Sequence, residues 1–360
     1  PKFSVVAVSL KKKGAAKFAL NGTGLERIDF KKIVYGRTNM AGSLIPRSDG
    51  TWEAGFQGDS FDLSPMWEDV LSQISNGNES SETLLDRLTL AVELKKVWLE
   101  DDIALYDVSG TFARDGDIWH MVLLKSRISD EADLELAIRP GPDGNRRLAM
   151  RSNNAGKVLK FLDYYENMIG GELSVTGTFD DVALGQPLQG QILVRDYRVV
   201  NAPVLARLLS IMALTGILDA LEGDGLAFSD LSAPFELQQG TFEIKEARAS
   251  GTALGFTANG KIFRHADVVD LEGTVIPAYA LNSVFGRIPL LGDLFTGGEK
   301  GGGIFAAAYT MTGPIEAPVV SVNPLSALTP GFLRNVFGII GKPGKERSVL
   351  EEEPPQLQLQ

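Results

Sequence analysis

Side chains that could perform catalysis or hold a metal are few and scattered along this chain. The two histidines, His120 and His265, lie far apart in the sequence, and neither has a nucleophile motif beside it. A nucleophile must lie within hydrogen-bond reach of its base, so we interpret both histidines as structural. The run Glu100-Asp101-Asp102 is better explained by a solvated turn, because successive side chains of an extended segment point to opposite sides. We predict no catalytic residue, no metal site and no cofactor, and we expect that the chain is not an enzyme.

Other catalytic and phosphate-binding signatures are also missing. The chain has no cysteine, which removes disulfides, thiolate catalysis and cysteine-based metal centres. Residues 21–26 lack the third glycine of a dinucleotide loop, and residues 297–303 lack the Gly-Lys-Ser/Thr ending of a phosphate loop. An enzyme would need Ser, Asp or Glu side chains to converge from distant strands, and the sequence leaves that alternative open.

The bulk composition indicates a folded chain with an acidic balance. Of its 360 residues, 44% are hydrophobic and 22% are charged, as expected for a chain that buries a core. The net charge of −11 disfavours nucleic acid as a partner, because phosphate binding needs clustered Lys and Arg. The longest apolar stretch, residues 202–221, is interrupted by charges, Pro and Gly, so it is a poor spanning helix. We therefore expect any membrane anchor to lie outside this sequence, which we interpret as a fragment or a processed chain.

Alternating hydrophobicity predicts that most of the chain is β-structure. Residues 88–94 and 133–139 place apolar side chains at every second position, which is typical of strands with one apolar face. Asp49-Gly50 predicts a hairpin between two strands within residues 42–56, with both turn residues at positive φ. An apolar face of this kind must be buried on another sheet, on itself or on a ligand. The five positions that we select as lipid-binding candidates are Leu90, Val92, Leu134, Leu136 and Ile138.

Helical periodicity interrupts the strands in three places. Residues 66–74 follow a Ser-Pro start, residues 154–169 end at a Gly-Gly pair, and residues 204–221 form the most apolar segment. Between these segments, the triplet Gly-Thr-Phe begins at Gly110, Gly177 and Gly240, at roughly even spacing. Such spacing favours an array of repeats, with chance recurrence in a β-rich chain as the alternative.

The C-terminal third carries a distinctive order of segments. An apolar stretch occupies residues 275–295, a strand ending in Gly-Pro occupies residues 303–314, and an Asn-Pro-Leu turn leads into an apolar tail within residues 320–341. This order resembles the C-terminal AsmA-like region of large bacterial envelope proteins of the YhdP/TamB type. The resemblance covers residues 170–341 best, and the first 150 residues match only in style.

The resemblance implies both a fold and a function. It implies an elongated, curled antiparallel β-sheet that forms an apolar groove, with amphipathic helices near the C-terminal half. The corresponding domains are β-groove repeats over residues 1–150, the AsmA-like region over 151–341, and a disordered tail over 342–360. The implied function is that of a periplasmic segment of a bridge-like lipid-transfer protein, which carries phospholipid between inner and outer membranes and is anchored to the inner membrane outside this chain. A non-catalytic scaffold for outer-membrane biogenesis is the alternative.

Apolar segments in the C-terminal half are candidates for contact with the outer membrane or a partner there. Ordinary core packing is the alternative for each of them. The candidate residues are Leu205, Leu208, Leu209, Met212, Leu290, Leu291, Leu294, Phe295, Phe332, Val336 and Phe337.

Overall fold

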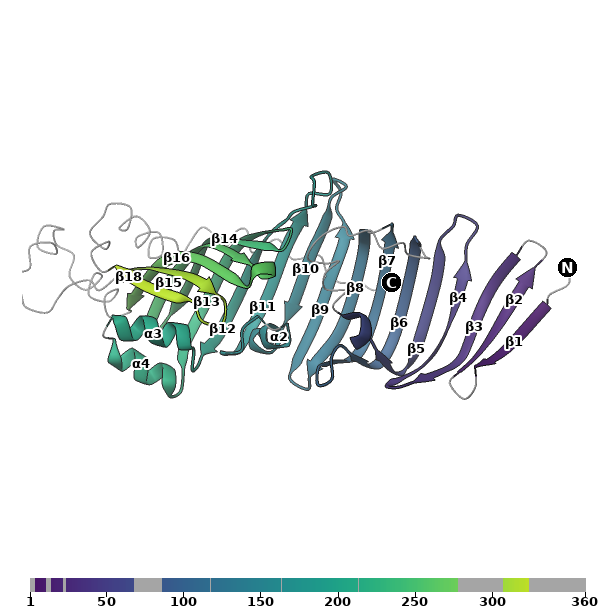
Figure 1. Ribbon diagram of the computed structural model, residues 1–360, viewed down its shortest axis with the longest axis horizontal. Coiled ribbons are helices and arrows are strands. Elements are labelled where there is room, and N and C mark those ends of the chain that lie inside the picture. The colour runs from purple at the N-terminus through teal and green to yellow at the C-terminus, as the bar shows by residue number, and fades with distance from the viewer. Residues whose placement is uncertain are drawn as a thin grey trace, which may run out of the picture. The chain divides into compact units, whose positions relative to one another are not determined.

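The computed structural model describes residues 4–10, 14–21, 24–67, 86–116, 118–162, 164–212, 214–277 and 307–323. These residues form eighteen strands, three α-helices and two short 3-10 helices (Figure 1). The predicted class, mainly β with a few helices, is therefore confirmed. The chain divides into two compact units, which we call the first unit (residues 1–164 and 174–188) and the second unit (residues 165–173 and 189–360). The domain boundary predicted at residue 150 remains a prediction.

In the first unit, the strands follow one another in the sheet in sequence order, each pairing with the next. All of these pairs are antiparallel except β5–β6. The strands are β1 (Ser4–Leu10), β2 (Gly14–Asn21), β3 (Gly24–Tyr35), β4 (Thr38–Pro46), β5 (Trp52–Asp62), β6 (Arg87–Trp98), β7 (Ala104–Asp115), β8 (Ile118–Ser129), β9 (Ala132–Pro140) and β10 (Arg146–Ser152).

The parallel pair β5–β6 ends at a cluster of hydrogen bonds around Arg37. The Arg37 guanidinium donates to both carboxylate oxygens of Asp62 at 3.1 Å and to the carbonyl oxygens of Glu100 and Asp101. Its guanidinium carbon lies 4.7 Å from the ring centroid of Trp98. The 3-10 helix η1 (Ser64–Met66) follows β5, and the Ser64 hydroxyl donates to Asp62 at 2.6 Å. One arginine therefore joins the end of β5 to the segment that follows β6.

The hairpin predicted at Asp49-Gly50 is present between β4 and β5, but its turn differs from the prediction. Only Gly50 has a positive φ, at 86°, while the Arg47 carbonyl accepts the Gly50 amide at 3.1 Å. The Asp49 carboxylate accepts the Thr51 amide at 2.9 Å. This is a three-residue loop in which a turn is followed by a left-handed glycine. The side-chain bond of Asp49 stabilises this turn without requiring a left-handed aspartate.

In the second unit, six strands pair consecutively and antiparallel. They are β13 (Leu226–Gln238), β14 (Thr241–Gly251), β15 (Leu254–Phe263), β16 (Val268–Pro277), β17 (Ala307–Pro314) and β18 (Val319–Asn323), and the 3-10 helix η2 (Arg264–Ala266) joins β15 to β16. β12 (Leu188–Val199) precedes them, and the boundary between the units falls inside β11 (Met168–Phe179).

The apolar segment 204–221 forms two helices, where the sequence predicted one. α3 (Pro203–Ile211) and α4 (Thr215–Glu222) contact each other, and the Asn201 amide donates to the Leu221 carbonyl oxygen at 3.1 Å. The end of α4 therefore returns to the start of α3, as in a helical hairpin. Leu209 and Leu221 are fully buried. Each helix of the hairpin therefore contributes one fully buried leucine to the second unit.

The helix predicted over residues 154–169 is shorter than expected. α2 (Ala155–Phe161) begins where the Asn154 side chain accepts the Lys157 amide at 3.1 Å, so Asn154 is its N-cap. The helix ends at Leu162, and Gly170 and Gly171 lie within β11 with φ of 67° and 89°. Both glycines therefore supply left-handed backbone inside a strand, and they do not end a helix.

The three Gly-Thr-Phe triplets occupy unrelated positions. Gly110 lies in the middle of β7, Gly177 lies near the end of β11, and Gly240 lies in the turn before β14 with φ of 73°. Equivalent repeats would place the triplet at the same point of each strand. The triplets therefore do not mark equivalent positions, and the array of repeats remains a prediction.

Candidate functional site

The five lipid-binding candidates lie on one face of the sheet in the first unit. Leu90 and Val92 come from β6, while Leu134, Leu136 and Ile138 come from β9. Two strands separate β6 from β9, so these residues belong to one surface only if the strands between them continue the pattern. The register of β7 and β8 shows whether the apolar positions of β6 and β9 are connected across the sheet.

The register aligns apolar residues from eight successive strands, β3 to β10, in two rows. Row one runs through Ile28, Leu44, Ala54, Leu90, Phe112, Val122, Ile138 and Leu148, and row two through Phe30, Gly42, Phe56, Val92, Gly110, Leu124, Leu136 and Met150. We call the face that carries both rows the apolar face. Apart from Ala54, Gly110 and Val122, the residues of both rows are only half-buried.

The opposite face, which we call the polar face, is charged along the same strands. One register row of that face runs through Gln57, Glu93, Ser109, Lys125, Glu135 and Arg151. Lys125 and Glu135 form an ion pair at 3.0 Å. Because successive side chains alternate between faces, this charged row lies on the side of the sheet opposite to the two apolar rows. The next row of the polar face carries no charge and runs through Gly55, Ala91, Thr111, Leu123, Ala137 and Ala149.

Two aromatic rings of row two meet above a glycine. The centroids of Phe30 and Phe56 lie 6.1 Å apart, although β4 runs between their strands. Strands two apart are separated by about 9.6 Å, so the rings lean toward each other over Gly42. A Cβ atom at Gly42 would overlap the Phe56 ring and the Gly55 carbonyl oxygen. Glycine at this position is thus required by the close approach of the rings and the neighbouring backbone.

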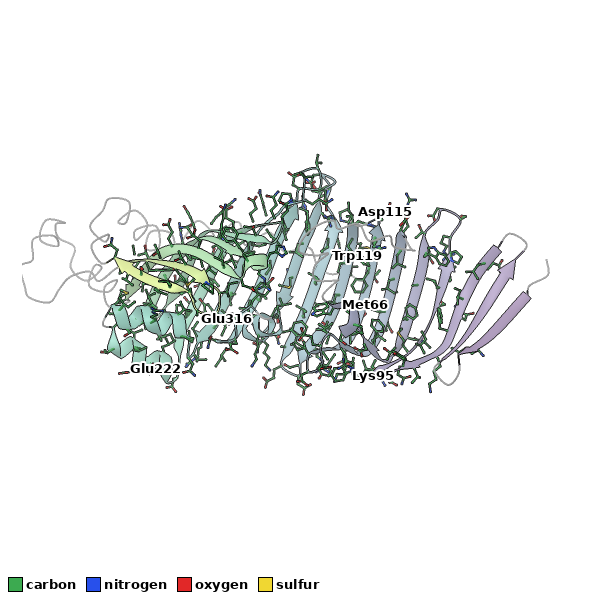
Figure 2. The ribbon with its side chains drawn as sticks, viewed as in Figure 1. Met66, Lys95, Asp115, Trp119, Glu222 and Glu316 are labelled. Atoms are coloured by element: carbon green, nitrogen blue, oxygen red, sulfur yellow. The ribbon has the colours of Figure 1, made fainter. Side chains whose placement is uncertain are left out.

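Two nearly buried arginines lie on the apolar face where the rows approach the end of the strands. Arg114 is 9% exposed, and its guanidinium carbon lies 5.6 Å from the ring centroid of Trp119. Trp119 is labelled in Figure 2. Arg146 donates to Asp181 at 2.8 Å, to the Gln186 side chain at 2.8 Å and to the Trp119 carbonyl oxygen at 3.2 Å. Neither arginine was found from the sequence, because both lie in strands whose alternation does not reveal that a charged position is buried.

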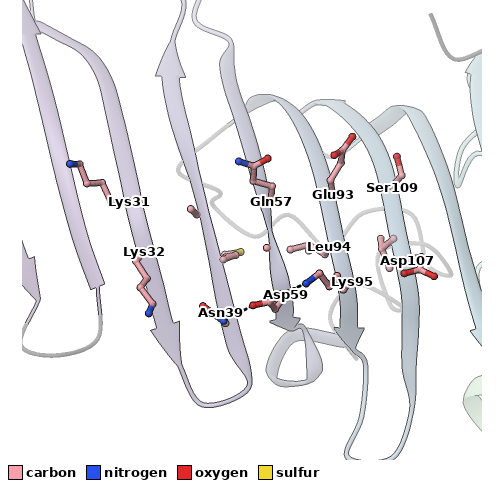
Figure 3. A pocket seen from close by; sticks show the side chains of 14 residues that line it. Lys31, Lys32, Asn39, Gln57, Asp59, Glu93, Leu94, Lys95, Asp107 and Ser109 are labelled. Atoms are coloured by element: carbon pink, nitrogen blue, oxygen red, sulfur yellow. Dashed lines mark hydrogen bonds and ion pairs between the residues drawn. The ribbon is translucent and has the colours of Figure 1, made fainter.

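A shallow hollow of about 700 Å³ lies over strands β3 to β7 (Figure 3). Lys31, Asp59, Glu93, Lys95 and Asp107 are among its lining residues. Lys95 contacts Asp59 at 2.6 Å, and this hydrogen bond lowers the pKa of the carboxyl group and raises the pKa of the amine. Charges of both signs surround the hollow, so it has no single electrostatic preference for a ligand.

Four of the predicted membrane- or partner-contacting residues lie in or directly after α3. Leu208 and Leu209 are buried, whereas Leu205 and Met212 are half-buried. α3 contacts both α4 and β18, so the two leucines belong to the core of the second unit. Contact of this segment with a membrane or partner remains a prediction. The other seven predicted contact residues, Leu290, Leu291, Leu294, Phe295, Phe332, Val336 and Phe337, lie outside the described residues, as does the tail 342–360.

The described ranges contain no group of three or more His, Cys, Asp or Glu side chains that could hold a metal ion. His120 and His265 are both exposed, and they lie on β8 and in η2. None of the helices in the described part of the chain is long and apolar enough to cross a membrane.

Comparison with known proteins does not place the chain in a family. No family model, no curated protein and no solved structure matches it.

Proposed function

We propose that this chain is a periplasmic segment of a bridge-like lipid-transfer protein, and that the apolar face of the first unit forms a groove for phospholipid acyl chains. The observation that carries the proposal is the pair of apolar rows across eight strands, most of whose side chains are only half-buried. Apolar side chains that are not fully covered within their own fold are suited to a hydrocarbon ligand.

The dimensions and curvature of the face agree with this proposal. Eight strands spaced by about 4.8 Å give rows about 34 Å long, whereas the acyl chains of one bilayer leaflet span about 15 Å. Phe30 and Phe56, from the strands that flank β4, approach each other over Gly42 on the apolar side. This packing favours a sheet that curls toward its apolar face, which would shield acyl chains from water and leave the headgroup at the open side.

The resemblance of residues 170–341 to the AsmA-like region supports the same proposal. What it implies is a location in the periplasm and an anchor to the inner membrane in a segment outside this sequence. It also implies the outer membrane, or a partner there, at the other end. Such a groove needs no catalytic residue, metal or cofactor, because movement of lipid along an apolar surface breaks no covalent bond.

Lipid extraction of the purified protein tests the proposal. We expect phospholipid to co-purify with the chain from a Gram-negative host and to be detected by native mass spectrometry. Leu90→Glu and Leu136→Glu each place a charge in an apolar row and should abolish the bound lipid. Ala91→Glu is the matched control, because Ala91 is exposed on the polar face of the same strand as Leu90. Stable, lipid-free wild-type protein would refute the proposal.

The second unit favours a different role, that of a non-catalytic scaffold or assembly module. Leu209, Leu221, Leu254, Val275 and Ile276 are each at most 1% exposed. These side chains are covered within the fold, which distinguishes them from the half-buried rows of the first unit. If the wild-type chain proves lipid-free, capture of an outer-membrane partner by this unit becomes the leading function.

A further inference from the structure

The loop of residues 180–187, which joins β11 to β12, holds two apolar side chains almost fully in solvent. Val182 is 93% exposed and Leu184 is 89% exposed. The next most exposed large apolar residue in the described part of the chain is Tyr35, at 66%. Single exposed apolar residues are common on protein surfaces, but two on one loop tip, both at this level, require an explanation.

Hydrogen bonds within the loop fix its conformation. The Asp180 carboxylate accepts the amides of Val182 at 3.2 Å and Ala183 at 3.0 Å. The Asp180 amide donates to the Pro187 carbonyl oxygen at 2.9 Å, and the Gln186 amide donates to the Ala183 carbonyl oxygen at 3.0 Å. The last bond closes a turn with Leu184 at its corner and Gly185 next, at φ of 78°. The exposure of the two side chains is thus a feature of an ordered turn.

The base of the loop is tied to β10 by the buried arginine. Arg146 forms an ion pair with Asp181 at 2.6 Å, and its side chain is only 10% exposed. The Asp181 carboxylate also accepts the Arg146 amide at 2.8 Å, and the Asp181 amide donates to the Asn145 side chain at 3.3 Å. These contacts fix the base of the loop on β10, and in this arrangement Val182 and Leu184 are exposed.

The chemistry of the tip favours a lipid surface over a protein surface. Inside a bilayer, backbone polar groups must be satisfied by the protein itself, and the Val182, Ala183 and Gln186 amides of this loop already are. Residues 182–185 include no aromatic residue and no arginine, the side chains that dominate protein–protein hot spots, where Val and Leu are under-represented. The Asp180 carboxylate is exposed on this loop, and Asp143 of the neighbouring β9–β10 hairpin is paired with Arg147 at 3.8 Å. No excess of positive charge from these residues favours an anionic surface, so an uncharged lipid surface suits the tip better.

We propose that the 180–187 loop is a membrane-docking element that inserts Val182 and Leu184 into the interface of a zwitterionic phospholipid bilayer. The inference does not depend on the proposed lipid groove, because a protein can dock on a bilayer without carrying lipid.

The absence of native cysteine allows a direct test with a single reporter. Val182→Cys and Leu184→Cys are labelled with an environment-sensitive fluorophore and mixed with phosphatidylcholine–phosphatidylethanolamine vesicles. We expect a blue shift at both positions and quenching by lipid-attached quenchers. Tyr35→Cys is the control, because Tyr35 is the next most exposed apolar residue and lies at the β3–β4 hairpin; it should show neither effect. An equal response at residue 35, or no response at 182 and 184, would overturn the proposal.

Vesicle flotation supplies the second measurement. The double variant Val182→Asp/Leu184→Asp should weaken partitioning on the order of tenfold, since binding scales with the apolar area inserted. Tyr35→Asp should leave partitioning unchanged, and anionic phosphatidylglycerol should not strengthen it. Loss of binding with unchanged co-purified lipid would separate docking from lipid carriage. Vesicle binding that survives the double variant, or that appears only with anionic vesicles, would contradict the proposal. If the wild-type protein bound a protein partner but no vesicles, the tip would be assigned to a protein surface.

Discussion

At the scale of single residues, Arg146 joins β10 to β8, to β11 and to the loop that follows β11. It bonds to Asp181, Gln186 and the Trp119 carbonyl oxygen, and its guanidinium carbon lies 4.3 Å from the ring centroid of Phe179. Because the Asp181 side chain is only 20% exposed, loss of the arginine would leave a poorly solvated carboxylate without its cation.

We therefore expect Arg146→Ala to lower the free energy of unfolding by about 3 kcal/mol, measured by urea denaturation. Arg87→Ala removes an ion pair whose side chains are 53% and 63% exposed, and it should cost less than about 1 kcal/mol. Equal losses in the two variants would show that burial does not govern the strength of these pairs.

Asp62 gives the stability of the first unit a dependence on pH. The hydrogen bond from Arg37, followed by that from Ser64, holds the pKa of Asp62 below its ordinary value of 3.8. A carboxyl group whose pKa is lowered by folding stabilises the protein fully above the unfolded pKa, and this contribution is lost as the pH falls through the folded pKa.

Asp62→Asn should therefore lower stability at pH 7, and the difference from wild type should shrink as the pH falls below about 3.8. Chemical denaturation at a series of pH values between 7 and 3 measures this difference. A gap that stays constant across that range would mean that the ion pair with Arg37 contributes nothing.

At the scale of secondary-structure elements, the glycines of β4 and β5 have opposite roles although they lie in paired strands. A Cβ atom at Gly42 would overlap the Phe56 ring and the backbone of β5, whereas a Cβ atom at Gly55 would meet nothing within 4 Å. The difference arises because the side-chain direction at Gly42 points into the Phe30–Phe56 contact, and that at Gly55 points to the other face.

We expect Gly42→Ala to destabilise the protein by about 2 kcal/mol, because the rings and strands must shift to admit the methyl group. Gly55→Ala should leave the stability unchanged or raise it by up to about 1 kcal/mol, since glycine weakens a strand interior. Thermal and urea unfolding of the two variants provide the comparison, and a similar cost at both positions would argue against the packing described for Phe30 and Phe56.

At the scale of the whole molecule, the proposed function assigns lipid to the first unit and a closed core to the second. Leu254 on β15 is 1% exposed, so Leu254→Ala should create a cavity and cost about 3 kcal/mol of stability. It should not change the amount of phospholipid that co-purifies, whereas Leu136→Glu should remove that lipid. Urea unfolding measures the loss of stability, and lipid extraction measures the bound phospholipid. If Leu254→Ala lost its lipid at temperatures where it remains folded, the lipid-binding site would have to be assigned to the second unit.

The sequence by itself determined the local character of this protein. Period-two alternation over residues 88–94 and 133–139 was sufficient to predict strands with one apolar face, because side-chain direction in a strand depends only on position along the chain. Asn154 was likewise predictable as a helix N-cap, since its side chain bonds an amide three residues away. The same local reasoning gave the mainly β class.

Only the tertiary structure decided which of these local features come together. Alternation within β6 and β9 does not determine how the strands are paired. The two apolar rows exist because β7 and β8, which lie between β6 and β9, align Phe112 and Val122 between Leu90 and Ile138. Helical periodicity over residues 204–221 did not reveal the break between α3 and α4, because both helices continue the apolar pattern and each buries a leucine, Leu209 in α3 and Leu221 in α4. The burial of Arg146 and the exposure of Val182 depend on contacts between segments 35 residues apart. Such long-range contacts leave no period in the sequence, and for this reason they had to be read from the fold.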